Sequence, residues 1–141
     1  MAVAKTQFWR DKILNLLKNT SVTGITTCYV GLFTAAPNDA YTSGSPTGTE
    51  VPALYAYVRE AITWSTVNVV ANTGDNIDNS VQITFPTASG GNWGTIVDVG
   101  IFDAATAGNL MYFGLLGAPQ VVNNGNQFIM PVTTGLVIQE S

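Results

Sequence analysis

The stretch TIVDVGIF at residues 95–102, followed by LMYFGLL at residues 110–116, decides the fold class of this sequence. Both stretches consist mainly of apolar and aromatic residues, which favour strands. The connection between them includes Asp103, Gly108 and Asn109, residue types that favour a turn. Two apolar stretches joined by such a connection predict an antiparallel β-hairpin.

Shorter strand candidates lie on both sides of this hairpin. Residues 26–33 alternate, with Cys28, Val30 and Leu32 on one face and Tyr29 and Phe33 on the other. Seven or eight short strands without helices between them predict a mainly β fold, an antiparallel β-sandwich or barrel with one N-terminal α-helix. The remaining strand candidates are residues 55–64, 67–70, 81–85, 127–132 and 136–139.

The single helix is expected at residues 6–18. Thr6 can cap its start, and Trp9, Ile13, Leu16 and Leu17 recur at helical spacing to form one apolar stripe. A helix of this length is not stable alone in water, so the stripe must dock on another surface. We favour docking on the chain's own sheet; docking on a neighbouring subunit is the alternative.

The chain divides into a short N-terminal segment and one larger unit. We expect an amphipathic helix within residues 1–21 and a single β-sandwich domain at residues 22–141, because 141 residues suffice for one core. Residues 35–54 contain Pro37, Pro46, Pro52 and two glycines, which predicts a long loop. A loop of this length is typical of a functional surface that becomes ordered against a partner.

Charged side chains are scarce and unevenly placed. Lys, Arg, Asp and Glu make up only 10% of the chain, against roughly 25% in a typical soluble domain. Residues 1–18 carry a net charge of +3, whereas residues 19–141 carry −7 and contain a single base, Arg59. We expect Arg59 to pair with one of these acids. An acidic body is not suited to neutralising phosphates, so we expect no direct nucleic-acid binding.

The sequence offers little for catalysis or metal binding. It has no histidine and one cysteine, Cys28, and a serine or cysteine nucleophile needs a neighbouring base that is usually histidine. We therefore predict no enzyme activity, no cofactor and no bound metal. Asp98 and Asp103 fall on opposite faces of an extended strand, so we interpret them as solvated strand-end residues and not as a catalytic pair. The oxygen-rich residues 73–79 are interpreted as a plain turn, with a calcium site as the alternative.

We also expect no membrane-spanning or secretion signal in this sequence. No segment has the roughly 18 consecutive apolar residues that a transmembrane helix needs, so we expect no membrane span. Gln7, Arg10, Asp11 and Lys12 interrupt the position where a secretion signal would have its apolar core, so we expect synthesis in a cytoplasm.

Several phrases, distributed in order over nearly the whole chain, point to a known family. They are ILN at 13–15, YVGLFTAAP at 29–37, GTEV at 48–51, YVREAITW at 57–64, ITFPTA at 83–88, WGTI at 93–96, GIFDA at 100–104, GNL at 108–110 and VN at 122–123. In these phrases the chain resembles a family of small tailed-bacteriophage proteins that are usually labelled tail-fibre-like. The resemblance implies a virion structural protein without enzymatic residues, made in the host cytoplasm.

The place of the protein on the particle is inferred from its size and charge. A receptor-reading fibre needs a long repetitive shaft, which 141 residues without repeats cannot supply. We therefore expect a capsid decoration (cement) protein that binds the major capsid protein and forms a homo-oligomer, with a trimer as one option. The alternatives are a small tail-fibre-like, tail or baseplate component that binds a tail protein, and a host-surface carbohydrate-binding module that uses Tyr41 and Trp93.

The residues expected to bind a partner are apolar or basic side chains of the helix and apolar side chains of the long loop. They are Phe8, Trp9, Arg10, Lys12, Ile13, Leu16, Leu17, Tyr41, Val51 and Leu54.

Overall fold

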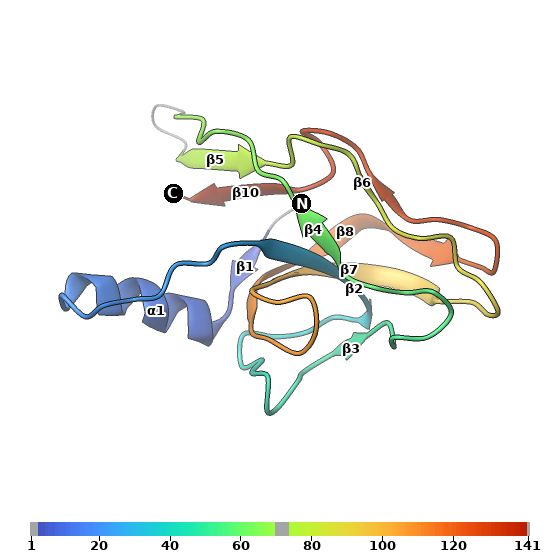
Figure 1. The fold of residues 1–141 in the computed structure, drawn as a ribbon, viewed down its shortest axis with the longest axis horizontal. Helices are drawn as coiled ribbons and strands as arrows, with labels where there is room; N and C mark the ends of the chain where they lie inside the picture. The colour runs from blue at the N-terminus through green and yellow to red at the C-terminus, as the bar shows by residue number, and fades with distance from the viewer. Residues whose placement is uncertain (1–2, 70–73, 141) are drawn as a thin grey trace.

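The predicted hairpin forms the centre of the fold. The structure is a computed structural model that describes residues 3–69 and 74–140. Its two longest strands, β7 (Gly94–Phe102) and β8 (Leu110–Val122), pair antiparallel, and β2 (Cys28–Ala35) pairs antiparallel with β7 (Figure 1). The hairpin and the alternating strand before it are therefore confirmed.

Short strands complete one large sheet and two small ones. The large sheet has the order β1-β8-β7-β2-β3, and β4 also pairs with β2. One small sheet joins β5 to β10, and the other joins β6 to β9. The short strands are β1 (Ala4–Lys5), β3 (Thr49–Glu50), β4 (Glu60–Ile62), β5 (Asp75–Asp78), β6 (Ile83–Thr84), β9 (Ile129–Met130) and β10 (Val137–Glu140), and the helix is α1 (Gln7–Leu17).

The mainly β, antiparallel fold with one N-terminal helix is confirmed. Residues 3–69 and 74–140 form ten strands, more than the seven or eight expected. Several have only two residues because turn-forming residues interrupt the segments that hold them, as Pro86 does just after β6. α1 has 11 residues, and no helix in the described part of the chain has the length and hydropathy to cross a bilayer.

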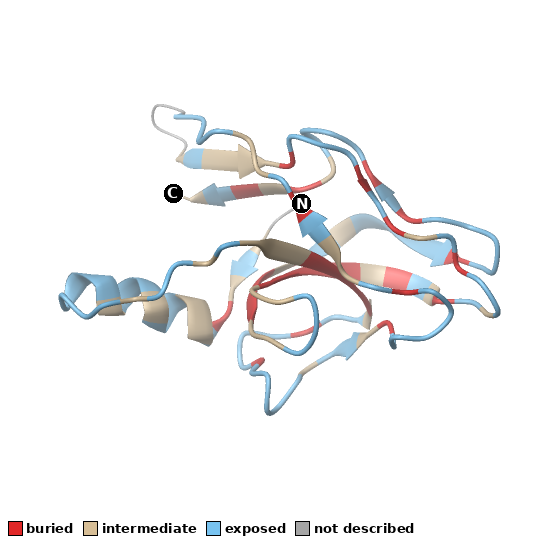
Figure 2. Cartoon of the chain, viewed as in Figure 1, coloured by how far each residue is buried: buried red, intermediate tan, exposed pale blue. Residues whose placement is uncertain are grey.

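Two faces of β2 supply two separate apolar clusters. Val30 and Leu32 lie in the main core, which the large sheet shares with residues of both small sheets such as Ile138 and Met130. Phe33 points the other way and packs with Phe102 in a second cluster. The burial pattern in Figure 2 follows this arrangement, with buried residues concentrated along β2 and β7. The alternation predicted for residues 26–33 is therefore present in the fold. Because it places apolar clusters on both faces of β2, the fold has a sandwich-like layering.

The loop at residues 35–54 folds back onto β2. Tyr41 packs edge-on against Phe102, with ring centroids 5.8 Å apart, and Val51 donates its amide proton to the Leu32 carbonyl oxygen at 2.9 Å. Gly48 has a φ of +72°, and a Cβ atom at this position would lie 2.6 Å from the Ala35 carbonyl oxygen. The loop is thus held to the sheet along its length, and only glycine fits its turn at residue 48.

Three expectations about the strands are wrong. Residues 67–69 form no named strand, since Asn68 makes only an isolated bridge to Asn76, and Val70 lies outside the described residues. Residues 55–64 are extended only at Glu60–Ile62, because Tyr55 and Ala56 have φ values of +53° and +68°, which turn the chain. Asp98 is not a solvated strand-end residue, since it is only 1% exposed and its carboxylate accepts the Gly114 amide proton at 3.1 Å. A register irregularity between Ile96 and Asp98 brings this amide into reach.

Residues 75–78 of the oxygen-rich segment form β5, which pairs with β10. Thr73, the first residue of that segment, lies outside the described residues. A segment hydrogen-bonded into a strand does not have the looped backbone of the calcium alternative. Within residues 3–69 and 74–140, no group of three or more Asp, Glu, Cys or His side chains is placed to hold a metal ion.

Candidate functional site

The most distinctive surface of the molecule is an arm that projects from the sandwich. The arm consists of α1 and residues 18–27, which return alongside the helix to β2 (Figure 1). Its base is attached to β8 and to the long loop, where the amide of Gln7 donates to the Asp39 carbonyl oxygen at 2.8 Å. Its far end extends beyond the sheet, as Figure 2 shows by the exposed surface along most of the arm.

Thr6 anchors the start of the helix to β8. Its side chain is fully buried, its amide donates to the Met111 carbonyl oxygen at 2.9 Å, and its hydroxyl donates to the Leu110 carbonyl oxygen at 2.5 Å. The same hydroxyl oxygen accepts the Trp9 amide proton at 3.4 Å. The predicted N-cap is confirmed, and this cap also fixes the position of the arm on the sheet.

A chain of polar contacts fixes the first helical turn. The indole Nε1 of Trp9 donates to the Tyr112 hydroxyl at 2.8 Å, and that hydroxyl donates to Oε1 of Glu140 at 2.6 Å. Lys5 pairs with the other oxygen of Glu140. Burial and the neighbouring Glu140 raise the pKa of the Tyr112 hydroxyl, so it stays protonated and remains a donor at neutral pH.

Two basic residues of the arm, Arg10 and Lys12, also make defined contacts. Arg10 pairs with Asp39 at 3.1 Å and donates to the Lys5 carbonyl oxygen at 2.7 Å. Lys12 lies over the Phe8 ring, 5.6 Å from its centroid. The Arg10 contacts add to the attachment of the first helical turns, whereas the Lys12 contact lies within the helix.

The helix ends at a defined motif. Asn19 has a φ of +55° and donates its amide proton to the Leu16 carbonyl oxygen at 3.2 Å. The amide of Thr20 donates to the Asn15 carbonyl oxygen at 3.2 Å. This pair of bonds around a left-handed residue is the Schellman arrangement, which satisfies the last helical carbonyls and fixes the end of the helix.

The second half of the helix leaves its apolar side chains in solvent. Leu14 is 56% exposed, Leu16 is 59% exposed and Leu17 is 82% exposed, whereas Trp9 packs against the main core. Ile13 lies between these two regions, at 36% exposure. Docking on the chain's own sheet is therefore limited to the base of the arm. When several leucines are exposed close together on one element of a soluble protein, they more often form an interaction surface than occur there by chance.

A cleft of about 400 Å³ opens at the base of the arm. It lies between the large sheet and the β5–β10 pair, and apolar side chains make up most of its lining. The sequence does not show these residues as one group, because they come from seven separate segments, one of which is represented by Ile101 of β7. They include Trp9, Ile25, Cys28, Trp64, Val67, Ile77, Met111, Tyr112 and Ile138, with Asp75 and Glu140 as the acidic members.

The loop residues expected to bind a partner lie in a different environment. Tyr41 and Val51 are only 5% and 3% exposed and pack within this chain, whereas Leu54 is 57% exposed. The structure therefore does not bring the loop side chains and the arm side chains together as one surface.

The aromatic residues that favoured a carbohydrate-binding module are buried. Tyr41 and Trp93 are 5% and 4% exposed, and Trp93 donates its indole proton to the Tyr55 carbonyl oxygen at 2.9 Å. Neither ring is available to stack on a sugar.

Comparison with known proteins gives a family for the chain. No curated protein sequence matches it. Residues 4–137 match the family model described as Podophage GP4 fiber I protein gp80. Since this match extends from the first strand into the last one, the chain belongs to that family of phage structural fibre proteins.

Proposed function

We propose that the protein is a structural subunit of the tail fibres of a podophage-like particle, and that the exposed half of its arm attaches it within that assembly. The observation that carries the proposal is the set of leucines at 14, 16 and 17, which are exposed on a helix whose base is firmly anchored. Covering apolar surface of this kind is the main favourable contribution in stable protein association. The family description, a fibre protein, supports the same role.

The anchoring of the arm supports attachment through a rigid element. Thr6, Trp9 and Tyr112 fix the base by hydrogen bonds, and the motif at Asn19 fixes the end of the helix. A surface on a fixed helix loses less conformational entropy on binding than a disordered segment does. The arm therefore suits permanent incorporation into a particle.

A capsid decoration role is a second candidate. It is favoured by the shape of the described residues, which form a sandwich of short strands without an elongated or repeated shaft (Figure 1). In this role the arm would contact the major capsid protein and not a tail protein.

Incorporation into particles tests the arm as the attachment surface. We expect Leu16→Glu combined with Leu17→Glu to reduce the copies of this protein per purified virion by at least tenfold, because buried unpaired carboxylates oppose docking. Leu115→Glu is the control, since Leu115 is 61% exposed but lies on β8 and is not part of the arm. Normal incorporation of the double variant would contradict the proposal.

A further inference from the structure

The lining of the cleft at the base of the arm suits an apolar occupant. Three polar groups of its wall are already engaged, because Trp9 donates to Tyr112, and Tyr112 donates to Glu140, which also pairs with Lys5. Groups engaged in this way offer few free donors or acceptors to a polar ligand such as a sugar. Apolar side chains make up most of the remaining lining. The chemistry of the cleft therefore matches aliphatic side chains.

The cleft and the arm have opposite charge. Asp75 and Glu140 are the charged residues that line the cleft in the described part of the chain; Glu140 is paired with Lys5, so Asp75 supplies its unpaired negative charge. Asp75 is exposed and has no ion pair within residues 3–69 and 74–140. Lys18, which follows the exposed leucines, is likewise exposed and forms no ion pair in the same residues.

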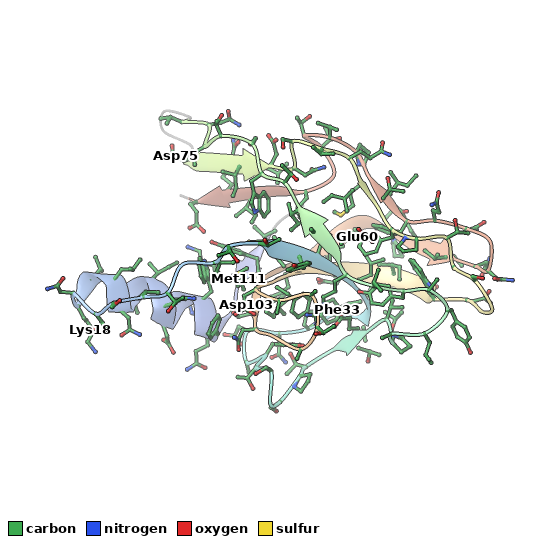
Figure 3. All side chains as sticks on the ribbon, in the orientation of Figure 1. Lys18, Phe33, Glu60, Asp75, Asp103 and Met111 are labelled. Carbon is green, nitrogen blue, oxygen red and sulfur yellow. The ribbon has the colours of Figure 1, made fainter. Side chains whose placement is uncertain are left out.

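The arm cannot fill the cleft of its own chain. Trp9 forms part of the cleft wall, and Leu17 lies about 12 Å further along the helix axis. In Figure 3, Lys18 lies at the far end of the arm, well away from Asp75 at the start of β5. Bringing the leucines to the cleft in the same chain would require the helix to break between Trp9 and Leu14.

We propose that the arm of one copy docks into the cleft of a second copy, with Leu14 and Leu17 against the apolar lining and Lys18 beside Asp75. The proposal rests on the proposed structural role and names a partner for the arm. The same chain carries a basic apolar arm and an acidic apolar cleft, so a second copy supplies both kinds of complementarity. Leu14 and Leu17 are one helical turn apart and can enter the cleft together.

Such a contact is head-to-tail, because two different surfaces meet. After a single contact the pair keeps one free arm, on one copy, and one free cleft, on the other. Repetition closes into a ring or continues as a filament, depending on the rotation between neighbours. Either outcome builds an assembly from a domain that has no shaft of its own.

The test is a mixing experiment in solution, followed by sedimentation velocity. The arm variant combines Leu16→Glu with Leu17→Glu, and the cleft variant is Val67→Arg, an exposed residue of the cleft lining. Wild type and the Leu115→Glu control should form species larger than the 14.9 kDa monomer, while each variant alone should stay monomeric. The two variants mixed should form a one-to-one dimer, because one retains the arm and the other retains the cleft.

A mixture that remains monomeric would overturn the proposal, as would a wild type that is monomeric at all concentrations reached. Near-UV circular dichroism of each variant shows whether its tertiary fold is retained.

A second comparison uses charge substitutions and leaves the apolar residues unchanged. Lys18→Asp and Asp75→Lys should each weaken self-association about threefold. Both changes in one chain should restore it, and failure to restore it would contradict the placement of Lys18 beside Asp75.

The single cysteine gives a readout that does not depend on mass. Cys28 lines the cleft and is a free thiol, so an inserted arm should shield it from a maleimide reagent. We expect slower labelling in wild type than in the arm variant, with the difference lost on dilution to monomers. Equal rates in concentrated solution would contradict insertion.

The failure of this proposal is distinguishable from failure of the proposed function. If wild type stays monomeric in solution but is present in purified virions, the arm binds a different partner and the structural role remains. If head-to-tail oligomers form but the protein is absent from virions, the contact remains and the structural role is wrong.

Discussion

Arg59 and Glu50 form a two-point ion pair that closes the long loop onto the sandwich. The Nε and Nη2 atoms of Arg59 donate to the two carboxylate oxygens of Glu50, each at 2.7 Å. The guanidinium lies 3.3 Å above the Phe102 ring centroid and also donates to the Ala104 and Ala107 carbonyl oxygens at 3.0 and 2.6 Å. The expected partner of the single base in the body is therefore the acid of β3, and the pair joins three loops.

Removing one member of this pair should be costly. The side chain of Arg59 is only 7% exposed and that of Glu50 is 22% exposed, so Arg59→Met would leave a largely buried carboxylate without its counterion. We expect Arg59→Met to lower the free energy of unfolding by about 3–5 kcal/mol, measured by urea denaturation. Arg59→Lys, which keeps the charge but loses the two-point geometry, should cost less. A loss below about 1 kcal/mol for Arg59→Met, the range of an exposed pair, would contradict this role.

Asp98 should make the protein less stable as the pH rises. Burial raises the pKa of this carboxyl from 3.8 to about 6 in the folded state. The folded protein therefore binds more protons than the unfolded chain between about pH 4 and pH 6, and its stability falls as the pH increases through that range. We expect a decrease of up to about 3 kcal/mol between pH 4 and pH 7.

Asp98→Asn isolates this contribution. The amide has no titrating proton, but its oxygen can still accept the Gly114 amide proton. The variant should lose most of the fall in stability between pH 4 and pH 7 that urea denaturation shows for wild type. An unchanged pH profile would mean that other carboxyl groups cause it.

Gly48 should tolerate no side chain. Its φ of +72° strains any other residue, and an added Cβ would lie 2.6 Å from both the Ala35 carbonyl oxygen and the Pro37 nitrogen. We expect Gly48→Ala to reduce the free energy of unfolding by about 2 kcal/mol or more. Gly44→Ala in the same loop is the control, because an added Cβ there would meet no atom within 4 Å. Equal effects at the two positions would show that the loop is not held to β2 as described.

Thr6 should control the order of the arm. Thr6→Ala removes the N-cap and leaves the Leu110 carbonyl oxygen without its side-chain donor. The expected loss is about 1–2 kcal/mol, concentrated at the arm base. Hydrogen exchange should therefore accelerate at the amides of α1 and remain unchanged in the β7–β8 hairpin. Equal acceleration throughout the molecule would show that the arm and the sandwich unfold as one unit.

The periodic parts of the fold could be predicted from the sequence. The alternation of Val30, Leu32 and Phe33 gave the two faces of β2, and the cap at Thr6 gave the start of the helix. The turn at Tyr55 and Ala56 could not be predicted, because non-glycine residues rarely adopt positive φ and no local pattern marks them.

The site was predicted only in part. Helical spacing identified Leu16 and Leu17 as an apolar stripe, but spacing does not show where the supporting sheet ends. The helix extends past β8, so residues patterned for docking lie in solvent. The cleft could not be found at all, because Cys28, Trp64 and Tyr112 meet only through pairing between distant strands.

The most direct test of a structural role in the fibre is the position of this protein in the intact particle, determined by cryo-electron microscopy. We expect copies of this sandwich in the tail fibres, each with its arm covered by neighbouring protein. Purified particles that lack the protein altogether would contradict this expectation.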